Sequence, residues 1–467
     1  MAKITKLWTD TVQVEFPKGS TPKLNNILTL HEGKTYLLVK RIIDEQNVKA
    51  VIIYKGANIA IGDEVVDSGA SFMVPVGKNI KGNIFSFDGK PMINPKEPIE
   101  YVEMNSISDN NKLDISSAIL LETGIKVIDF FSPIVKGNKL GIFGGAGVGK
   151  TVLMKEIIFN VNRNNKNTGN IFIGSGERSR EGIELYHELV KSNLMKNSTL
   201  FISKMNESPG ARMSIVPIGV TAAEYARDIN KEDVLLFVDN MYRFIQAENE
   251  VSASLGKKPS IGGYQATLDT DIANIEERLY RNNNGSITSF QTMFLPMDDL
   301  SDPSAVSIFN HLDGNIVLSR AIAAKNIFPA IDPMESNTNS LKVDLVGQRH
   351  FDAVARAKAV INKYRDLEDV IMILGFAELD EENKKIVKIA LQLENFFTQN
   401  FFTTEHFTNA PGVYVKMQDT VDSVIKILDG EFLEQTPDIF SYIADVSSLK
   451  TDAQLKEMQK EESHEKK

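Results

Sequence analysis

The sequence of 467 residues contains no cysteine. This absence excludes disulfide bonds, thiolate metal ligands and cysteine nucleophiles, and it fits a reducing compartment. Long hydrophobic runs are missing too, because no stretch approaches the roughly 18 uninterrupted apolar residues of a membrane-spanning helix. The N-terminal segment from Met1 to Trp8 has no apolar secretory core. We therefore expect a cytoplasmic protein that reaches a membrane only through partner subunits.

An excess of positive charge is also absent. The chain has 52 lysine and arginine residues against 62 aspartate and glutamate residues, which gives a formal net charge of −10. Binding along nucleic acid requires a basic surface that displaces counterions from the phosphates, so we expect no nucleic-acid partner. An acidic chain can still bind a single nucleotide, because a few local amides and cations suffice.

Apolar residues make up 42% of the chain, which is enough for two or three domains with their own cores. Near the N-terminus, short alternating runs such as Thr11–Phe16 and Val51–Tyr54 predict the strands of a small β-barrel or sandwich. From about Pro75, apolar strand patterns alternate with longer helical patterns. This alternation is typical of a mostly parallel sheet with crossover helices.

The hydrophobic period becomes helical in the last part of the chain. There Ile386, Ile389, Leu393 and Phe396 share one face of an expected helix. We therefore predict a multidomain α/β protein, with an N-terminal β-barrel at 1–78, a central α/β domain at 79–347 and a helical domain at 348–467.

A glycine-rich segment in the central domain fits the pattern G-x-x-x-x-G-K-[ST] of a phosphate-binding loop. A strand pattern, Lys139–Phe143, precedes it, and a helix pattern follows with Met154 and Ile158 on one face. Glycines let successive backbone N–H groups point at phosphate oxygens, and the helix N-terminus adds a positive dipole end. A glycine-rich turn that binds nothing is the alternative. We predict that the nucleotide is bound by Gly144, Gly145, Ala146, Gly147, Val148, Gly149, Lys150, Thr151 and Val152.

Within this loop, two side chains have specific tasks. We expect Lys150 to reach the β- and γ-phosphates and the Thr151 hydroxyl to ligate Mg²⁺. A second Mg²⁺-directed group follows the apolar strand pattern Val234–Val238, which ends in Asp239. This is the Walker B pattern, in which a carboxylate at a strand end approaches the metal beside the phosphate loop. A strand followed by an Asx-turn is the alternative for an isolated segment, and the phosphate loop earlier in the chain favours the metal site.

A third strand pattern, Asn170–Gly174, leads into a segment that contains Glu177 and Arg178. Hydrolysis requires a group that orients and polarises a water molecule in line with the γ-phosphate, and a glutamate at a neighbouring strand end can do this. We predict this role for Glu177. Arg178 and Arg243 are candidates for stabilising charge on the transferred phosphoryl group. As single residues, each of the two arginines could equally belong to a surface ion pair.

Taken in order, these segments resemble the β subunit of F-type ATP synthases. The resemblance implies a central domain of the RecA-like type between the barrel and the helical domain. It covers nearly the whole chain and rests on the segments 144–151, 176–182, 234–244, 250–253, 286–289, 298–303, 311–313 and 318–323.

The resemblance also implies roles for single residues. Glu177 matches the catalytic glutamate of the family, and Arg178 and Arg243 match its phosphate-contacting arginines. Glu181 and Asp239 match the carboxylates that hold the water shell of Mg²⁺.

An adenine pocket is implied as well. Phe328 stands where the family has an adenine-stacking tyrosine, and Phe401 and Phe407 match the aromatic walls of that pocket. The alternative is that these three rings simply belong to the hydrophobic core.

The family works as a ring in which catalytic β and non-catalytic α subunits alternate around a rotating γ shaft. The resemblance therefore implies an enzyme that hydrolyses or synthesises ATP, with Mg²⁺ and ATP or ADP as its bound groups. An α-type partner would supply a further arginine at the interface. Through its partners the ring would lie peripherally on the inner face of the cell membrane, attached to a membrane sector or to other membrane machinery.

Some segments depart from the usual β pattern. The segment Ala377–Asn383 replaces the acidic lever that contacts the shaft, and it has lost the first acid of that lever. We favour a divergent F-type-like paralogue, of the kind that mollicutes carry, over a housekeeping synthase. A non-catalytic ring subunit is a third hypothesis, although such subunits usually have glutamine at the position of Glu177. An RNA translocase or a secretion ATPase of the same superfamily is a fourth.

Overall fold

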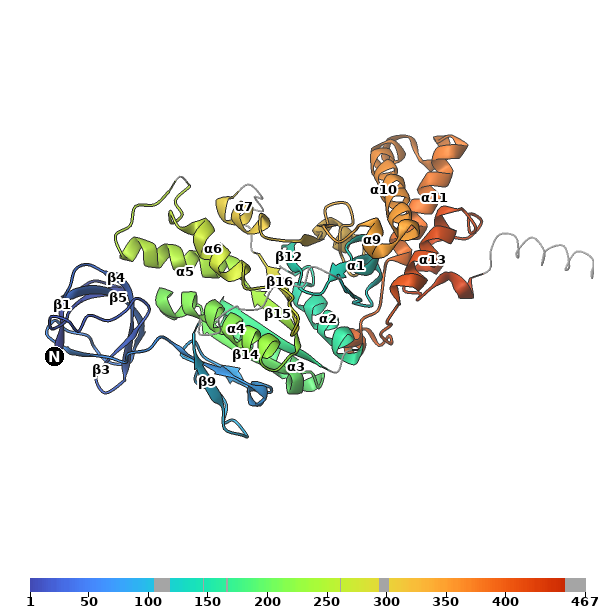
Figure 1. Ribbon diagram of the computed structural model, residues 1–467. Helices are drawn as coiled ribbons and strands as arrows, with labels where there is room; N and C mark the ends of the chain where they lie inside the picture. Colours follow the sequence, from blue (N-terminus) through green and yellow to red (C-terminus); the bar gives the residue numbers. More distant parts are fainter. Residues whose placement is uncertain (105–117, 146, 165–166, 261, 294–301, 450–467) are drawn as a thin grey trace, which may run out of the picture. The chain divides into compact units, whose positions relative to one another are not determined.

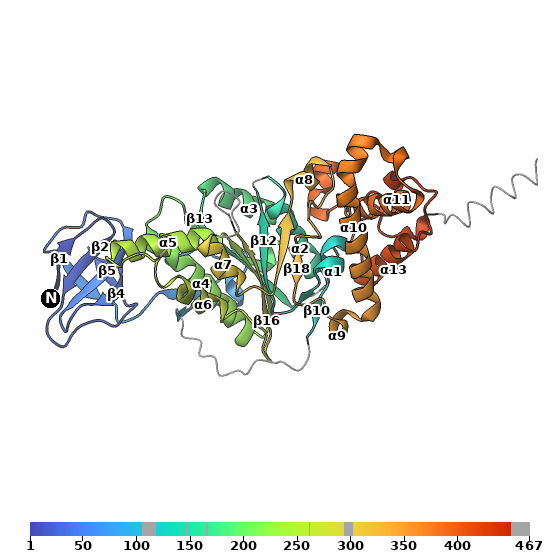
Figure 2. The same cartoon turned by 90° about the horizontal axis from the view of Figure 1, so that it is seen from above.

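The computed structural model describes residues 1–104, 118–145, 147–164, 167–260, 262–293 and 302–449 (Figures 1 and 2). The chain forms two compact units. The first contains residues 1–117, 137–141 and 167–312, and the second contains residues 118–136, 142–166 and 313–467. The domain boundaries at 78 and 347 stay predictions.

The first unit begins with a closed barrel, drawn in blue in Figure 1. Valines and leucines at alternate positions, such as Val12, Val14, Leu37 and Val39, fill its interior and are completely buried. The predicted N-terminal barrel is thus confirmed. Its strands follow the order β1 (Ala2–Leu7), β2 (Thr11–Glu15), β5 (Asn47–Lys55), β4 (Thr35–Ile42), β3 (Ile27–Leu30) and β6 (Glu64–Asp67).

A parallel sheet forms the centre of the first unit. Its neighbouring strands are β16 (Ser286–Thr292), β15 (Asp233–Asp239), β13 (Thr168–Glu177), β14 (Ser198–Lys204) and β8 (Ile84–Phe85), and all four pairings are parallel. The central strand β15 reads as an unbroken apolar run from Val234 to Val238, as expected for a strand that is buried on both faces. The predicted α/β core is confirmed.

Helix α4 (Pro209–Asp228) packs against β13, β14 and β15. Ser208 caps its N-terminus by accepting a hydrogen bond from the N–H of Ala211, and proline occupies its first turn. The helix comes close to β13 at Gly219, where a Cβ atom would lie 2.5 Å from Cγ1 of Ile173. The other elements of this unit are β7 (Met73–Val76), η1 (Lys78–Ile80), β9 (Glu100–Glu103), α3 (Ser179–Lys191), η2 (Met195–Asn197), α5 (Met241–Ser254), α6 (Leu268–Glu276) and α7 (Pro303–Phe309).

The second unit contains the end of β12 (Lys139–Gly144), which is followed by α2 (Lys150–Asn164), and it contains β17 (Gly314–Leu318) and β18 (Asn337–Thr338). A bundle of α10 (Gln348–Leu374), α11 (Glu381–Phe396) and α13 (Met417–Leu428) completes it, as Figure 1 shows. Its smaller elements are β10 (Leu120–Leu121), α1 (Lys126–Phe131), β11 (Ile134–Val135), α8 (Arg320–Ala324), α9 (Val343–Val346), η4 (Phe376–Glu378), η5 (Phe402–Thr404), α12 (Glu405–Thr408), η6 (Pro437–Phe440) and η7 (Val446–Ser448).

The buried face of α11 differs from the expected one by one residue. Val387 and Ala390 are buried together with Leu393 and Phe396, whereas the side chains of the predicted pair at 386 and 389 are half-buried. The apolar stripe of this helix is wider than the face that contacts α10 and α13, so the pattern alone does not select the innermost residues. The predicted helical domain is nevertheless confirmed.

A buried lysine joins α1 to the bundle. The side chain of Lys126 is completely buried, and its Nζ donates hydrogen bonds to the carbonyl oxygens of Phe396 and Ile443. Burial lowers the pKa of this amine to about 7.

Within the described residues, no helix has both the length and the apolarity that a membrane crossing requires.

Replacement of Gly219 by alanine is expected to destabilise the first unit by about 1–3 kcal/mol, because the added methyl group overlaps Ile173 of β13. Chemical denaturation of Gly219→Ala measures this effect. The double variant Gly219→Ala/Ile173→Ala should be less destabilised than the sum of the two single variants. Strict additivity would contradict the proposed contact.

Candidate functional site

The predicted phosphate-binding loop lies in the second unit, between the end of β12 and the start of α2. Gly147 and Gly149 have φ angles of +80° and +100°, which side chains with a Cβ atom rarely adopt. Lys150 is the first residue of α2, and its Nζ donates a hydrogen bond to the carbonyl oxygen of Gly144 at 3.0 Å. The ammonium group therefore lies on the loop itself. Ala146 lies outside the described residues.

Arg320 also lies against this loop, which the sequence did not predict. A Cβ atom on Gly145 would lie 2.7 Å from the central carbon of the Arg320 guanidinium, so a larger residue at this position would displace the arginine head group. Arg320 begins α8, directly after β17. Its segment contributed to the family resemblance, and that was the only signal that could have drawn attention to it.

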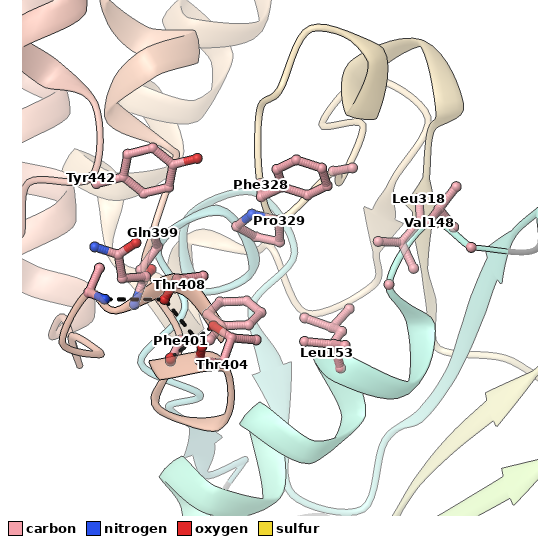
Figure 3. Close-up of a pocket in the computed structure, with 16 residues that line it drawn as sticks. Val148, Leu153, Leu318, Phe328, Pro329, Gln399, Phe401, Thr404, Thr408 and Tyr442 are labelled. Atoms are coloured by element: carbon pink, nitrogen blue, oxygen red, sulfur yellow. Dashed lines mark hydrogen bonds between the residues drawn. The ribbon is translucent and has the colours of Figure 1, made fainter. Parts of the chain in front are cut away.

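A mostly apolar pocket of about 530 Å³ adjoins the loop within the second unit. Figure 3 shows Val148 and Leu153 on one side of it and Gln399 and Tyr442 on the other. A cavity of this size with few polar groups is typical of a small-molecule site. It is lined by Gly147, Val148, Gly149, Val152, Leu153, Leu318, Phe328, Pro329, Ala330, Gln399, Asn400, Phe401, Thr404, Thr408, Ala410 and Tyr442.

Two of the three predicted adenine-pocket residues line this pocket. Phe401 is buried, whereas the Phe328 side chain is 44% exposed and faces the open space (Figure 3). Phe407 does not line the pocket and is 78% exposed. Tyr442 was not predicted, because it lies in a C-terminal segment without a recognisable motif. Gln399 was missed as well, although it is close in sequence to Phe401.

The predicted carboxylates lie in the first unit. Glu177 ends β13 and Asp239 ends the neighbouring parallel strand β15, so both are at the carboxyl edge of the sheet. Burial raises the pKa of the Glu177 carboxyl far above its ordinary value, and the nearby charges of Asp239 and Glu181 raise it further. Arg243 opposes this shift. The four residues thus form one electrostatically coupled cluster.

Local contacts hold this cluster in place. The Thr292 hydroxyl donates a hydrogen bond to the Asp239 carboxylate, and Asn240 caps α5 by accepting from the N–H of Arg243. Gly176, with a φ angle of +66°, turns the chain just before Glu177. Arg178 is different, since its side chain is 74% exposed and lies 3.8 Å from Glu181, which is a loose ion pair.

The residues of the first unit fit a magnesium ion. Within the described part of the chain, no group of three or more acidic, histidine or cysteine side chains could hold a metal ion. Nucleotide-bound Mg²⁺ does not need such a group, because phosphate oxygens and waters supply most of its ligands. The mutual repulsion of Glu177 and Asp239, which raises the pKa of Glu177, is a cost that a nearby cation would relieve.

Comparison with known families finds a match for the central domain and another for the C-terminal domain. The nucleotide-binding domain of the ATP synthase alpha/beta family matches residues 124–338, and the C-terminal domain of V and A type ATP synthases matches residues 341–438. A relative from Mycoplasmopsis pulmonis (strain UAB CTIP), named ATP synthase subunit beta 2, is 48% identical over 470 residues. The match covers 99% of this chain and 100% of the relative.

The chain belongs to the ATP synthase α/β family. The predicted resemblance to ATP synthase β subunits is confirmed, and so is the class of enzyme at the level of this family. The C-terminal match is to V and A type synthases, whereas the sequence suggested the F-type. The roles of the single site residues stay predictions.

Glu177→Gln is expected to stabilise the protein above neutral pH. The carboxyl has a pKa of about 4.5 in the unfolded chain and a raised pKa in the folded protein, so the folded state binds more protons. Its contribution to stability is present at low pH and is lost as the pH rises through the folded pKa. Thermal unfolding from about pH 5 to 9 should show the variant gaining about 1 kcal/mol or more over the wild type at the alkaline end.

The exposed Glu184→Gln on α3 is the matched control and should show no such pH dependence. A constant difference between Glu177→Gln and the wild type across the pH range would contradict the raised pKa.

Phe328→Ala is expected to weaken ADP binding by about 1 kcal/mol or more, because the ring faces the pocket and offers a stacking surface. Phe407→Ala removes a ring that does not line the pocket and should leave affinity nearly unchanged. Isothermal titration of both variants with Mg-ADP distinguishes the two aromatics. Equal losses would place Phe407 in the site after all.

Proposed function

We propose that this chain is the catalytic β-type subunit of a rotary ATPase that hydrolyses or synthesises Mg-ATP. The observation that carries the proposal is the half-buried Glu177 carboxylate beside Asp239, at the carboxyl edge of parallel strands. The chain also carries a phosphate-binding loop with its lysine at the start of α2. Ligands of such sheets bind at the carboxyl ends of the strands.

In this proposal, Gly144–Thr151 bind the phosphates through backbone N–H groups, and Lys150 neutralises charge on the β- and γ-oxygens. Glu177 accepts a proton from the attacking water and holds it in line. Burial makes this carboxylate a stronger proton acceptor than an exposed one. Arg243 and Arg178 stabilise charge that develops on the transferred group.

Magnesium would be held by the Thr151 hydroxyl and, through water, by Glu181 and Asp239. When bound, it supplies charge neutralisation on the phosphate oxygens. Phe328 and Phe401 hold the adenine base, and Val152 contacts the nucleotide from α2.

We further propose an alternating ring with an α-type subunit, a γ-type shaft and attachment to the inner face of the cell membrane through partner subunits. A divergent F-type-like motor is favoured over a housekeeping synthase. The relative's name, beta 2, and the altered segment Ala377–Asn383 support this choice. A non-catalytic ring subunit is less favoured, because a glutamate and not a glutamine occupies position 177.

Glu177→Gln should lower Mg-ATP turnover by at least roughly 10²-fold while nucleotide binding is retained. The measurement requires the complex purified after co-expression with an α-type partner, because an isolated chain lacks the partner's arginine. The complex with Glu184→Gln should turn over ATP like the wild type. Near-normal turnover of Glu177→Gln would reject the catalytic assignment.

A further inference from the structure

A completely buried carboxylate on α2 has no place in the chemistry proposed above. The side chain of Glu156 accepts hydrogen bonds from the backbone N–H groups of Phe402 and Thr403, at 3.1 and 3.0 Å. It also accepts a bond of 3.0 Å from the Thr403 hydroxyl. Three donors from one short segment thus converge on a single carboxylate.

This segment is η5, part of the wall of the nucleotide pocket. Phe401 precedes η5 and Thr404 ends it, and both line the pocket. Aromatic contacts add to the polar ones, because the rings of Phe159 on α2 and Phe402 stack at 5.0 Å. The first turn of α2 belongs to the phosphate loop, and its next turns anchor the aromatic wall.

We propose that Glu156 is a positioning residue that fixes the base-binding wall of the pocket at a set distance from the phosphate loop. Because α2 starts at Lys150 and carries Glu156, one rigid helix connects the two ends of the site. A nucleotide that contacts both ends gains affinity when that distance is fixed in advance. This inference rests on the proposed nucleotide function and adds a residue to it.

The energetics explain why a charged group is used. Burial raises the pKa of Glu156, and the bonds from Thr403 and Phe402 oppose this shift by favouring the ionised form. Backbone N–H groups bond more strongly to a carboxylate than to a neutral oxygen. A glutamine of the same shape has only one acceptor oxygen, and its amide group would bring donors toward donors. Glu156→Gln therefore loosens η5 without creating a cavity.

The test compares ligands with and without a base. Isothermal titration of the full-length chain measures the affinities for Mg-ADP and for Mg-pyrophosphate. Mg-ADP probes both the base-binding wall and the phosphate loop, whereas Mg-pyrophosphate has no base and probes the phosphate loop alone. Glu156→Gln should weaken Mg-ADP by roughly tenfold, the scale of a lost charge-assisted bond, and Mg-pyrophosphate by less than about twofold. Thr403→Val, which removes one of the three donors, should have a smaller effect in the same direction, and Thr403→Ser should restore wild-type behaviour.

Glu232→Gln is the matched control. Glu232 is also buried, is bonded to Lys81 at 2.8 Å and lies in the first unit. Glu232→Gln should lower the free energy of unfolding by an amount similar to that of Glu156→Gln, and it should leave the ratio of the Mg-ADP and Mg-pyrophosphate affinities unchanged.

Equal weakening of both ligands by Glu156→Gln, or no weakening, would overturn this inference while the proposed function stands. A wild-type chain that binds neither ligand would overturn the proposed function and this inference together.

Discussion

The proposed chemistry depends on the parallel register of β13 and β15. In that register Gly174 lies opposite Asp239, and Glu177 follows as the last residue of β13. Glu177 is thus held near Asp239, where its own burial and the negative charge of Asp239 both oppose its ionisation. Repulsion between two carboxylates costs free energy when no cation is bound. A cation bound near them with a phosphate group would remove that cost, and perturbed carboxyl groups of this kind are typical of functional sites.

The surrounding helices maintain this arrangement. Helix α4 approaches β13 closely enough that a methyl group on Gly219 would overlap the side chain of Ile173. The hydroxyl of Thr292 on β16 orients Asp239 from the other side. The site is therefore supported by the core of the first unit. Precise sites generally need surrounding residues that hold the functional side chains rigidly.

In the second unit a single helix, α2, has two tasks. Its N-terminus completes the phosphate loop, and Glu156 in its middle accepts three hydrogen bonds from Phe402 and Thr403 in the pocket wall. A buried charge is costly unless it is fully bonded. The free-energy cost of burying Glu156 is offset because its carboxylate accepts several hydrogen bonds at once, which an apolar side chain cannot do.

The sequence by itself determined the architecture and the phosphate loop. The alternating and helical periods follow from burial on one face, and the pattern at 144–151 places glycines where Gly147 and Gly149 adopt positive φ angles. Both signals are local, so they can be recognised without knowing the fold. The apolar strand patterns that end near Glu177 and Asp239 predicted these two carboxylates, which now lie at neighbouring strand ends. The likeness to a known family added Glu181 and the aromatic residues of the adenine pocket.

Only the tertiary structure decided which distant residues share the pocket. Tyr442 and Gln399 line it while Phe407 does not, and Arg320 lies against Gly145. It also revealed the bonds between Glu156 and Thr403, residues far apart in the chain. Such contacts depend on how helices and loops pack and leave no period or spacing in the sequence. For the same reason the innermost face of α11 could not be chosen from its apolar pattern.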